Sequence, residues 1–413
     1  MSLRQQIEQE IRERGPIPFS RYMEICLYDP IAGYYSRNSE QFGKAGDFYT
    51  SSDVHAVFGR LLARQFQEMW QALDRPPRLE FLELGPGRGL FARDVLDWSQ
   101  KKFPDFFAAL TYTLQESSPA LLAKLQDTMS DHLACRRALL AGECVGTAAL
   151  GCPVERSSTA IEGAQLCEIR RSCPPQTPLI VFANEFFDAL PVEILSPLGK
   201  LHLACEANRL AEIWLPPTAE ELEFLDRYSV HPEATERIEV PLAAQRWMAD
   251  IATAIRQGFL LIVDYGYSRS EQLAGRHRGT LMAYRQHSAS PNPYQAPGEQ
   301  DLTAHVNFTA LTAAAEQAGM RPQKLITQSQ FLMGIGERTQ FADAFEQCRL
   351  AQDRGPQQAR VWPDGMEERA KVALQLKHLV SPTGMGETFQ VLVASRAVEP
   401  DKIAALSGLQ FGQ

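Results

Sequence analysis

Short apolar segments that alternate with helix-patterned segments run through most of this 413-residue chain. We interpret the apolar segments as buried strands because of their length and composition; they span residues 79–84, 110–115, 179–183 and 259–263. Apolar residues at helical spacing lie between them, at about 90–101, 118–128 and 241–256. Buried strands that alternate with helices form parallel sheets covered on both faces, so we predict an α/β fold.

Two regions interrupt this alternation, and one precedes it. Residues 1–75 combine helical spacing with turn-forming residues, so we expect an N-terminal cap of helices and loops. Residues 129–176 show no clean period and hold five of the eight cysteines, so we expect a variable insertion there with room for one strand. Residues 192–240 contain three strand-like segments separated by Gly199 and Asn208, which predicts an inserted antiparallel β-meander.

The rest of the chain closes the sheet domain, which we expect to span residues 76–400. The elements predicted after residue 307 are a helix at 308–318, a strand at 323–327, helices at 337–352 and 364–379, and a strand at 388–394. We treat residues 330–385 as a helical addition to the sheet domain.

Composition excludes several classes of protein. The net charge of −9 argues against a general nucleic-acid-binding protein, and the apolar run at 259–263 is far shorter than the roughly 20 residues of a membrane-spanning helix. The N-terminal segment is a charged amphipathic helix pattern with Glu8, Glu10 and Glu13, unlike a signal peptide or a presequence. No CxxC pair or zinc-ligand spacing occurs, so we expect reduced thiols, no metal site and a cytoplasmic location.

A glycine-rich turn follows the first predicted strand and opens a helix. Glu83 precedes a cluster of turn residues, which are Gly85, Pro86, Gly87 and Gly89. Glycines at such a turn let the backbone approach a ligand closely, and the helix N-terminus adds free N–H donors. Glu116, with Ser117 beside it, ends the next strand, where a carboxylate can accept both hydroxyls of a ribose. The simpler alternative is a turn flanked by two solvated acids.

This pattern resembles the S-adenosylmethionine site of class I methyltransferases. The resemblance narrows to the MidA-type family, which includes bacterial methyltransferases and mitochondrial proteins that assist the assembly of respiratory complex I. The ordered motifs that carry it are Gly15–Phe19, Tyr28–Tyr35, Gly46–Thr50, Glu83–Gly87, Asn184–Pro191, Val263–Tyr267 and Asp301–Phe308. They cover residues 13–395; Asn307 departs from the Asp that many relatives carry there.

The resemblance implies a seven-stranded Rossmann-like sheet and S-adenosyl-L-methionine as cofactor, with S-adenosyl-L-homocysteine as product. It also implies methylation of an arginine in a complex I core subunit, so we expect a protein partner. A homodimer through the predicted meander near Trp214 is a further possibility. The residues expected around the cofactor are Gly46, Asp47, Tyr49, Thr50, Glu83, Gly85, Pro86, Gly87, Gly89, Glu116, Ser117, Asn184 and Glu185.

Three side chains are candidates for catalysis. Glu185 and Asp188 follow the third predicted strand, at the sheet edge where ligands of open α/β sheets bind. Carboxylates can orient a guanidinium and accept its proton, which arginine requires because its pKa exceeds about 12. The alternative is that Asn184 and Asp188 only cap a turn. His305 is expected to face the substrate channel, although a lone histidine is more often structural.

Two further segments each have two alternative roles. The segment from Gly46 to Thr50 could fold over the cofactor, with Asp47 near its amino group, or could simply cap a helix. Asp264 ends another strand at the same edge and pairs with either a ligand or a backbone turn.

The sequence is also compatible with three other functions. They are a small-molecule O- or N-methyltransferase, a non-catalytic assembly chaperone that retains the cofactor pocket, and a dehydrogenase. The dehydrogenase is the weakest, because the chain has no GxGxxG at the turn and Glu83 has no role in dinucleotide binding.

Overall fold

The computed structural model describes residues 1–37, 56–141, 177–206, 209–285, 288–290, 292–346 and 364–411. Its central sheet holds nine strands among these residues, in a path of seven hydrogen-bonded neighbours with two short strands attached. The path runs β15 (Arg321–Pro322), β17 (Phe389–Arg396), β10 (Gly258–Tyr267), β5 (Leu179–Asn184), β2 (Leu79–Leu84), β3 (Leu110–Gln115) and β4 (Ala138–Leu140). The attached strands are β14 (Val306–Asn307) on β10 and β16 (Ile326–Thr327) on β17. This sheet confirms the predicted α/β class.

Parallel pairing brings the carboxyl ends of the inner strands to one edge. Strand β2 lies between β3 and β5, and β10 lies beside β5, all parallel to one another. Strand β17 runs antiparallel to β10. The chain segments that follow β2, β3, β5 and β10 therefore meet at the same edge.

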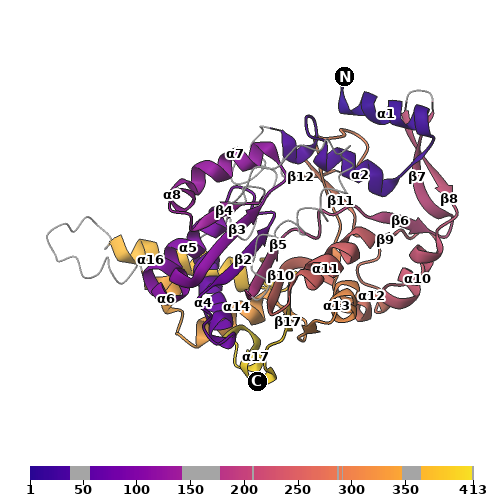
Figure 1. Cartoon of the computed structure of the whole chain (residues 1–413). Helices are drawn as coiled ribbons and strands as arrows, with labels where there is room; N and C mark the ends of the chain where they lie inside the picture. Colours follow the sequence, from indigo (N-terminus) through magenta and orange to yellow (C-terminus); the bar gives the residue numbers. More distant parts are fainter. Residues whose placement is uncertain are drawn as a thin grey trace.

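Alternating side chains of these strands fill two separate cores. Phe259, Leu261 and Val263 of β10 pack on one face with helices α4 (Ala56–Ala72) and α5 (Leu90–Lys102). Leu260 and Ile262 pack on the opposite face with α11 (Leu242–Ala254) and α13 (Phe308–Gln317). The near-continuous apolar sequence of β10 thus reflects burial on both faces, and Figure 1 shows the sheet between these two helix layers.

The predicted meander is present, and it is part of a larger sheet. Strands β6 (Glu193–Ser196), β7 (Gly199–Glu206) and β8 (Arg209–Leu215) are antiparallel neighbours in sequence, and β9 (Ile238–Val240) pairs with β6. The N-terminal segment adds β1 (Ile17–Pro18), which pairs with β7. Sequence analysis missed β1, because a two-residue strand ending in proline has no period of its own.

A third core joins the N-terminal helices to this sheet. Helices α1 (Leu3–Arg14) and α2 (Phe19–Tyr28) bury Ile7, Phe19 and Tyr22 against Leu201 and Leu203 of β7. Figure 1 shows both helices beside β7, with the short sheet β11 (Met282–Arg285), β12 (Ser288–Ser290) and β13 (Asp301–Thr303) nearby. The N-terminal segment is therefore packed against residues some 170 positions or more later in the chain.

The remaining helices cover the outer surfaces. They are α6 (Pro104–Ala109), α7 (Pro119–Thr128), α8 (Ser130–Ala134), α10 (Ala219–Tyr228), α12 (Arg269–Leu273), α14 (Gln328–Glu337), α16 (Asp364–Val380) and α17 (Pro400–Ala404), with 3₁₀ turns at Tyr34–Ser36 and Ser407–Leu409. No helix in the described part of the chain is long and apolar enough to span a bilayer. Cys26, Cys135 and Cys205 are free thiols.

Three predicted elements differ from the structure in their bounds. Within residues 129–176, the one strand expected is present as β4, which follows α8 and pairs with β3 of the central sheet, whereas 142–176 lie outside the described residues. The single strand predicted at 323–327 is divided into β15 and β16. The helix predicted at 337–352 begins later: α14 ends at Glu337, Gln340 and Phe341 interrupt the chain with positive φ angles of 51° and 55°, residues 342–346 are helical, and 347–352 lie outside the described residues.

We predict that Gly258→Ala lowers the free energy of unfolding by about 2–4 kcal/mol. Gly258 opens β10 with φ of 142°, and an added Cβ would overlap the carbonyl oxygen of Leu179. Gly275→Ala is the matched control, since its φ is 86° but no atom lies within 4 Å of an added Cβ. Denaturant unfolding should show a cost of only about 1 kcal/mol for the control; equal costs would mean that the clash at Gly258 is relieved.

Candidate functional site

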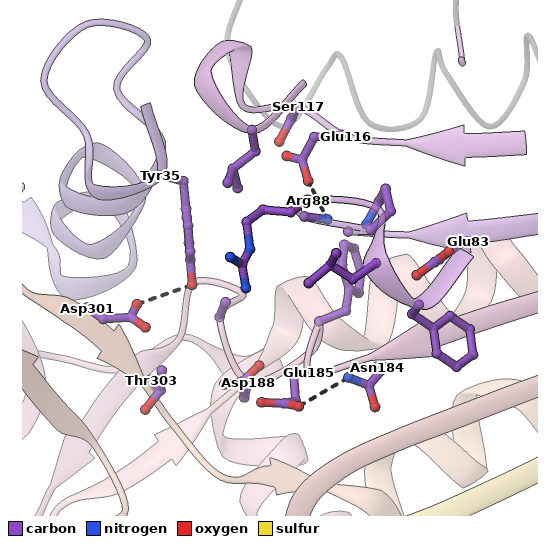
Figure 2. Close-up of a pocket in the computed structure, with 18 of the residues that line it drawn as sticks. Tyr35, Glu83, Arg88, Glu116, Ser117, Asn184, Glu185, Asp188, Asp301 and Thr303 are labelled. Carbon is purple, nitrogen blue, oxygen red and sulfur yellow. Dashed lines mark hydrogen bonds between the residues drawn. The ribbon is translucent and has the colours of Figure 1, made fainter. Parts of the chain in front are cut away.

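A cavity opens where the carboxyl ends of β2, β3, β5 and β10 meet. Its lining comes from the glycine turn after β2, the ends of β3 and β5, Tyr265 of β10, Asp301 and Thr303 of β13, and the N-terminal residues Tyr28 and Tyr35. Figure 2 shows several of them around one space, among them Tyr35, Asp301 and Thr303. Of the residues predicted around the cofactor, Glu83, Gly85, Pro86, Gly87, Glu116, Ser117, Asn184 and Glu185 line it.

The glycine turn presents bare backbone to this cavity. Gly85, Gly87 and Gly89 have φ angles of 65°, 56° and 75°, in the left-handed region that glycine tolerates best. No atom lies within 4 Å of a Cβ built on Gly87, so a side chain there would project into open space. Gly89 lies directly before α5, whose first two residues, Leu90 and Phe91, line the cavity. The turn can accommodate a ligand in contact with its backbone.

Glu116 joins the glycine turn to the end of β3. Its carboxylate accepts hydrogen bonds from the backbone N–H of Gly87 at 3.0 Å and of Ser118 at 2.8 Å. Burial raises its pKa to about 7, although these two donors act in the opposite direction. The carboxylate is thereby held in place at the wall of the cavity.

Glu83 lies at the end of β2, buried beneath the turn. The hydroxyl of Tyr112 donates to its Oε2 at 2.7 Å. Burial raises the pKa of Glu83 to about 8, and the charge of Glu116 adds to the shift. Glu83 is therefore largely protonated near neutral pH.

Asp264 fixes the turn that follows β5. Its Oδ2 accepts the backbone N–H groups of Phe186 at 3.2 Å, Phe187 at 2.9 Å and Asp188 at 3.4 Å. Glu185 within this turn has φ of 50°, an uncommon conformation for a residue with a side chain. The interpretation of Asp264 as the partner of a backbone turn is thus confirmed.

The turn directs two carboxylates into the cavity. Glu185 Oε1 accepts a hydrogen bond from Asn184 Nδ2 at 3.1 Å, and both side chains line the cavity. Asp188 accepts a hydrogen bond from the Tyr265 hydroxyl through Oδ2, while its buried Oδ1 has no hydrogen-bond partner. Burial raises the pKa of Asp188, and it raises that of Asp264 together with the charges of Asp188 and Glu185.

Several lining residues were not among the predicted site residues. The Tyr35 hydroxyl donates to Asp301 Oδ1 at 3.2 Å, and the Tyr28 hydroxyl donates to the carbonyl oxygen of Ala189 at 2.9 Å. Thr303 and Arg88 also line the cavity. Tyr28, Tyr35 and Asp301 belong to the motifs that carry the family resemblance, but their residue types alone indicate no role in a site.

Other predicted residues lie elsewhere. His305 is not among the lining residues; its Nδ1 lies 3.1 Å from Nδ1 of His277, and its ring meets Tyr265 edge-on with centroids 5.3 Å apart. Asn307 caps α13, accepting from the Ala310 N–H at 3.0 Å. Gly46, Asp47, Tyr49 and Thr50 lie outside the described residues.

Comparison with known proteins identifies relatives of this chain. A family model described as "Putative S-adenosyl-L-methionine-dependent methyltransferase" matches residues 61–326. The Drosophila melanogaster "Protein arginine methyltransferase NDUFAF7 homolog, mitochondrial" is 32% identical over 77% of this chain and 71% of its own length. The human "Protein arginine methyltransferase NDUFAF7, mitochondrial" is 27% identical over 79% and 71%.

A solved structure shares both fold and cofactor chemistry. It is a COG1565 superfamily member from Burkholderia thailandensis bound to S-adenosyl-homocysteine. The TM-score is 0.74 and the identity 25%, with 98% of this chain and 94% of that chain covered.

We predict that Glu83 makes the protein less stable as the pH rises. Its folded pKa of about 8 lies above its ordinary value of 4.5, so the stability contributed by its protonated form is lost as the pH rises from 4.5 through 8. Between pH 6 and 8 the free energy of unfolding should fall by about 1–2 kcal/mol more in the unmodified protein than in Glu83→Gln. Denaturant unfolding at both pH values measures this, with Glu316→Gln, an exposed site on α13, as control. An unchanged pH dependence in Glu83→Gln would contradict the prediction.

Proposed function

We propose that this chain, which belongs to a family of S-adenosyl-L-methionine-dependent methyltransferases, methylates an arginine side chain of a protein. The chain is a methyltransferase and its cofactor is S-adenosyl-L-methionine. The observation that carries the arginine proposal is the pair Glu185 and Asp188, both directed into the same cavity as the glycine turn and Glu116.

The residues at one end of the cavity fit the cofactor. The open space at Gly87 allows close approach to the backbone, and Glu116 has a fixed carboxylate that can accept two ribose hydroxyls. We propose that Gly85, Pro86 and Gly87 contact the cofactor beside it, with Ser117 and Asn184 at its margins. When bound, the cofactor supplies an activated methyl group on a sulfonium sulfur.

The residues at the other end fit a guanidinium. Two carboxylates can hold the planar, cationic group through paired hydrogen bonds and orient one nitrogen toward the methyl donor. The unpartnered Oδ1 of Asp188 is an acceptor that such a donor would satisfy. Burial raises the pKa of Asp188, which makes it a better proton acceptor than an exposed carboxylate. Asp188 or Glu185 would take the proton that the methylated nitrogen loses.

The relatives support a protein arginine as the acceptor. Those quoted above are described as protein arginine methyltransferases, and the family resemblance extends the proposal to a core subunit of respiratory complex I. We propose accordingly a cytoplasmic bacterial enzyme with a protein substrate. A small-molecule acceptor is the outcome that the first experiment below is designed to detect.

The purified chain is added with tritiated S-adenosyl-L-methionine to a lysate of cells that lack this chain. We expect methyl transfer to label protein in that lysate. Acid hydrolysis of the labelled protein should release methylated arginine, because Glu185 and Asp188 are suited to a guanidinium. The same reaction is run on the small-molecule fraction of the lysate. Label in that fraction alone would exclude a protein substrate, and label on lysine or a carboxyl group would exclude arginine.

We predict that Glu185→Ala and Glu116→Ala separate transfer from cofactor binding. Glu185→Ala should reduce methyl transfer at least about 100-fold while the Kd for the cofactor changes less than about threefold, because Glu185 acts on the acceptor. Glu116→Ala should weaken cofactor binding at least about tenfold through loss of a charged acceptor. Calorimetry and the transfer assay are run on both variants. Loss of cofactor binding in Glu185→Ala would place Glu185 in the cofactor subsite.

A further inference from the structure

Acidic side chains far outnumber basic ones around the cavity. Among its described lining residues, five are acidic and one is basic. The acidic residues are Glu83, Glu116, Glu185, Asp188 and Asp301; the basic residue is Arg88. A cavity of this kind suits cationic groups, and an anionic group has one side-chain counterion in the described lining.

Arg88 is placed by the backbone of the glycine turn. It lies between Gly87 and Gly89, whose positive φ angles turn the chain back on itself before α5 begins at Leu90. Figure 2 shows its side chain extending from the turn into the cavity, with Glu116 on one side and the turn that bears Glu185 and Asp188 on the other. Its guanidinium therefore lies between the two ends that the proposed function assigns to ribose and acceptor.

The cofactor has one anionic group. The sulfonium sulfur bears three groups, which are the methyl group, the 5′ carbon of the ribose and the amino-acid end with its ammonium and carboxylate. With the ribose at Glu116 and the methyl group toward Glu185, the sulfur lies between these two ends, and the amino-acid end branches from it toward the rest of the lining. Arg88 is the one basic side chain in the described lining and extends into the cavity between the other two ends, and the ionised carboxylates of the lining would repel a cofactor carboxylate left without a cation.

We infer that Arg88 binds the carboxylate of the cofactor's amino-acid end and selects for cofactors that carry it. The inference rests on the cofactor placement in the proposed function, although it does not depend on the acceptor. Arginine suits this role because its planar fork of N–H donors matches a carboxylate with two parallel hydrogen bonds. The N–H groups that begin α5 are the competing candidates for the same carboxylate.

Calorimetry of the whole chain with two ligands tests the inference. The ligands are S-adenosyl-L-methionine and decarboxylated S-adenosylmethionine, which differ in the carboxylate alone. Arg88→Met keeps the length of the side chain and removes its charge. Arg93→Met is the matched control. Arg93 is the fourth residue of α5, pairs with Asp94 at 3.4 Å and is not among the described lining residues.

We expect Arg88→Met to raise the Kd of S-adenosyl-L-methionine by about 10- to 100-fold, the loss of a charged hydrogen-bonded pair. The Kd of decarboxylated S-adenosylmethionine should stay within about twofold, which also shows that the cavity is intact. For Arg88→Lys, the Kd of S-adenosyl-L-methionine should lie between those of the unmodified protein and Arg88→Met, because lysine keeps the charge and loses the planar fork of donors. Arg93→Met should bind both ligands as the unmodified protein does.

Two results would overturn the inference. Equal weakening of both ligands by Arg88→Met would mean that Arg88 shapes the cavity and does not recognise the carboxylate. No change for either ligand would assign the carboxylate to the N-terminus of α5. Because neither measurement requires an acceptor, failure of arginine methylation and failure of this inference are distinguished.

Discussion

The geometry of the cavity depends on the hydrogen bonding of the Asp264 carboxylate to the turn after β5. Asp264 belongs to β10, and its Oδ2 accepts N–H groups from three consecutive residues, Phe186 to Asp188. These donors have no strand partner once β5 has ended, and leaving them buried and unpaired would cost about 1–3 kcal/mol each. The same contact holds Glu185 at a φ of 50°, which is unfavourable for a residue with a Cβ. Parallel pairing of β5 with β10 thus determines where both candidate catalytic carboxylates lie.

Burial gives the cavity its electrostatic character. Glu83 and Glu116 are buried deeply enough that their pKa values rise to about 8 and about 7, while Asp188 and Asp264 are also raised. A cluster of buried carboxyl groups without cations is unfavourable for folding and is relieved by partial protonation. A cationic ligand also lowers this cost, because it stabilises the ionised carboxylates. Binding of a cation in this cavity should therefore be coupled to release of protons.

The parts of the site that could be predicted from sequence are those with a local cause. The glycine turn, Glu116 at the end of β3 and the carboxylates after β5 all follow from short motifs at strand ends, and the parallel order of the strands brings them together. Tyr35 and Asp301 were not predicted, because their contact joins segments 266 residues apart and no local pattern encodes it. His305 shows a different limit, since its motif is distinctive but its ring packs against His277 and the lining residue Tyr265 and is not itself among the described lining residues.

The N-terminal segment links the antiparallel sheet of β1 and β6–β9 to the wall of the cavity. Tyr28 and Tyr35 form part of the wall, yet the helix and turn that carry them are held by the third core and by the pairing of β1 with β7. Ser118, which caps α7 beside Glu116, also donates its hydroxyl to the carbonyl oxygen of Tyr35. The wall therefore contacts both the cofactor end and, through the hydrogen bond from Tyr28 to Ala189, the acceptor end. Because the elements that carry Tyr28 and Tyr35 pack in this core, the stability of the antiparallel sheet bears on the shape of both ends of the cavity.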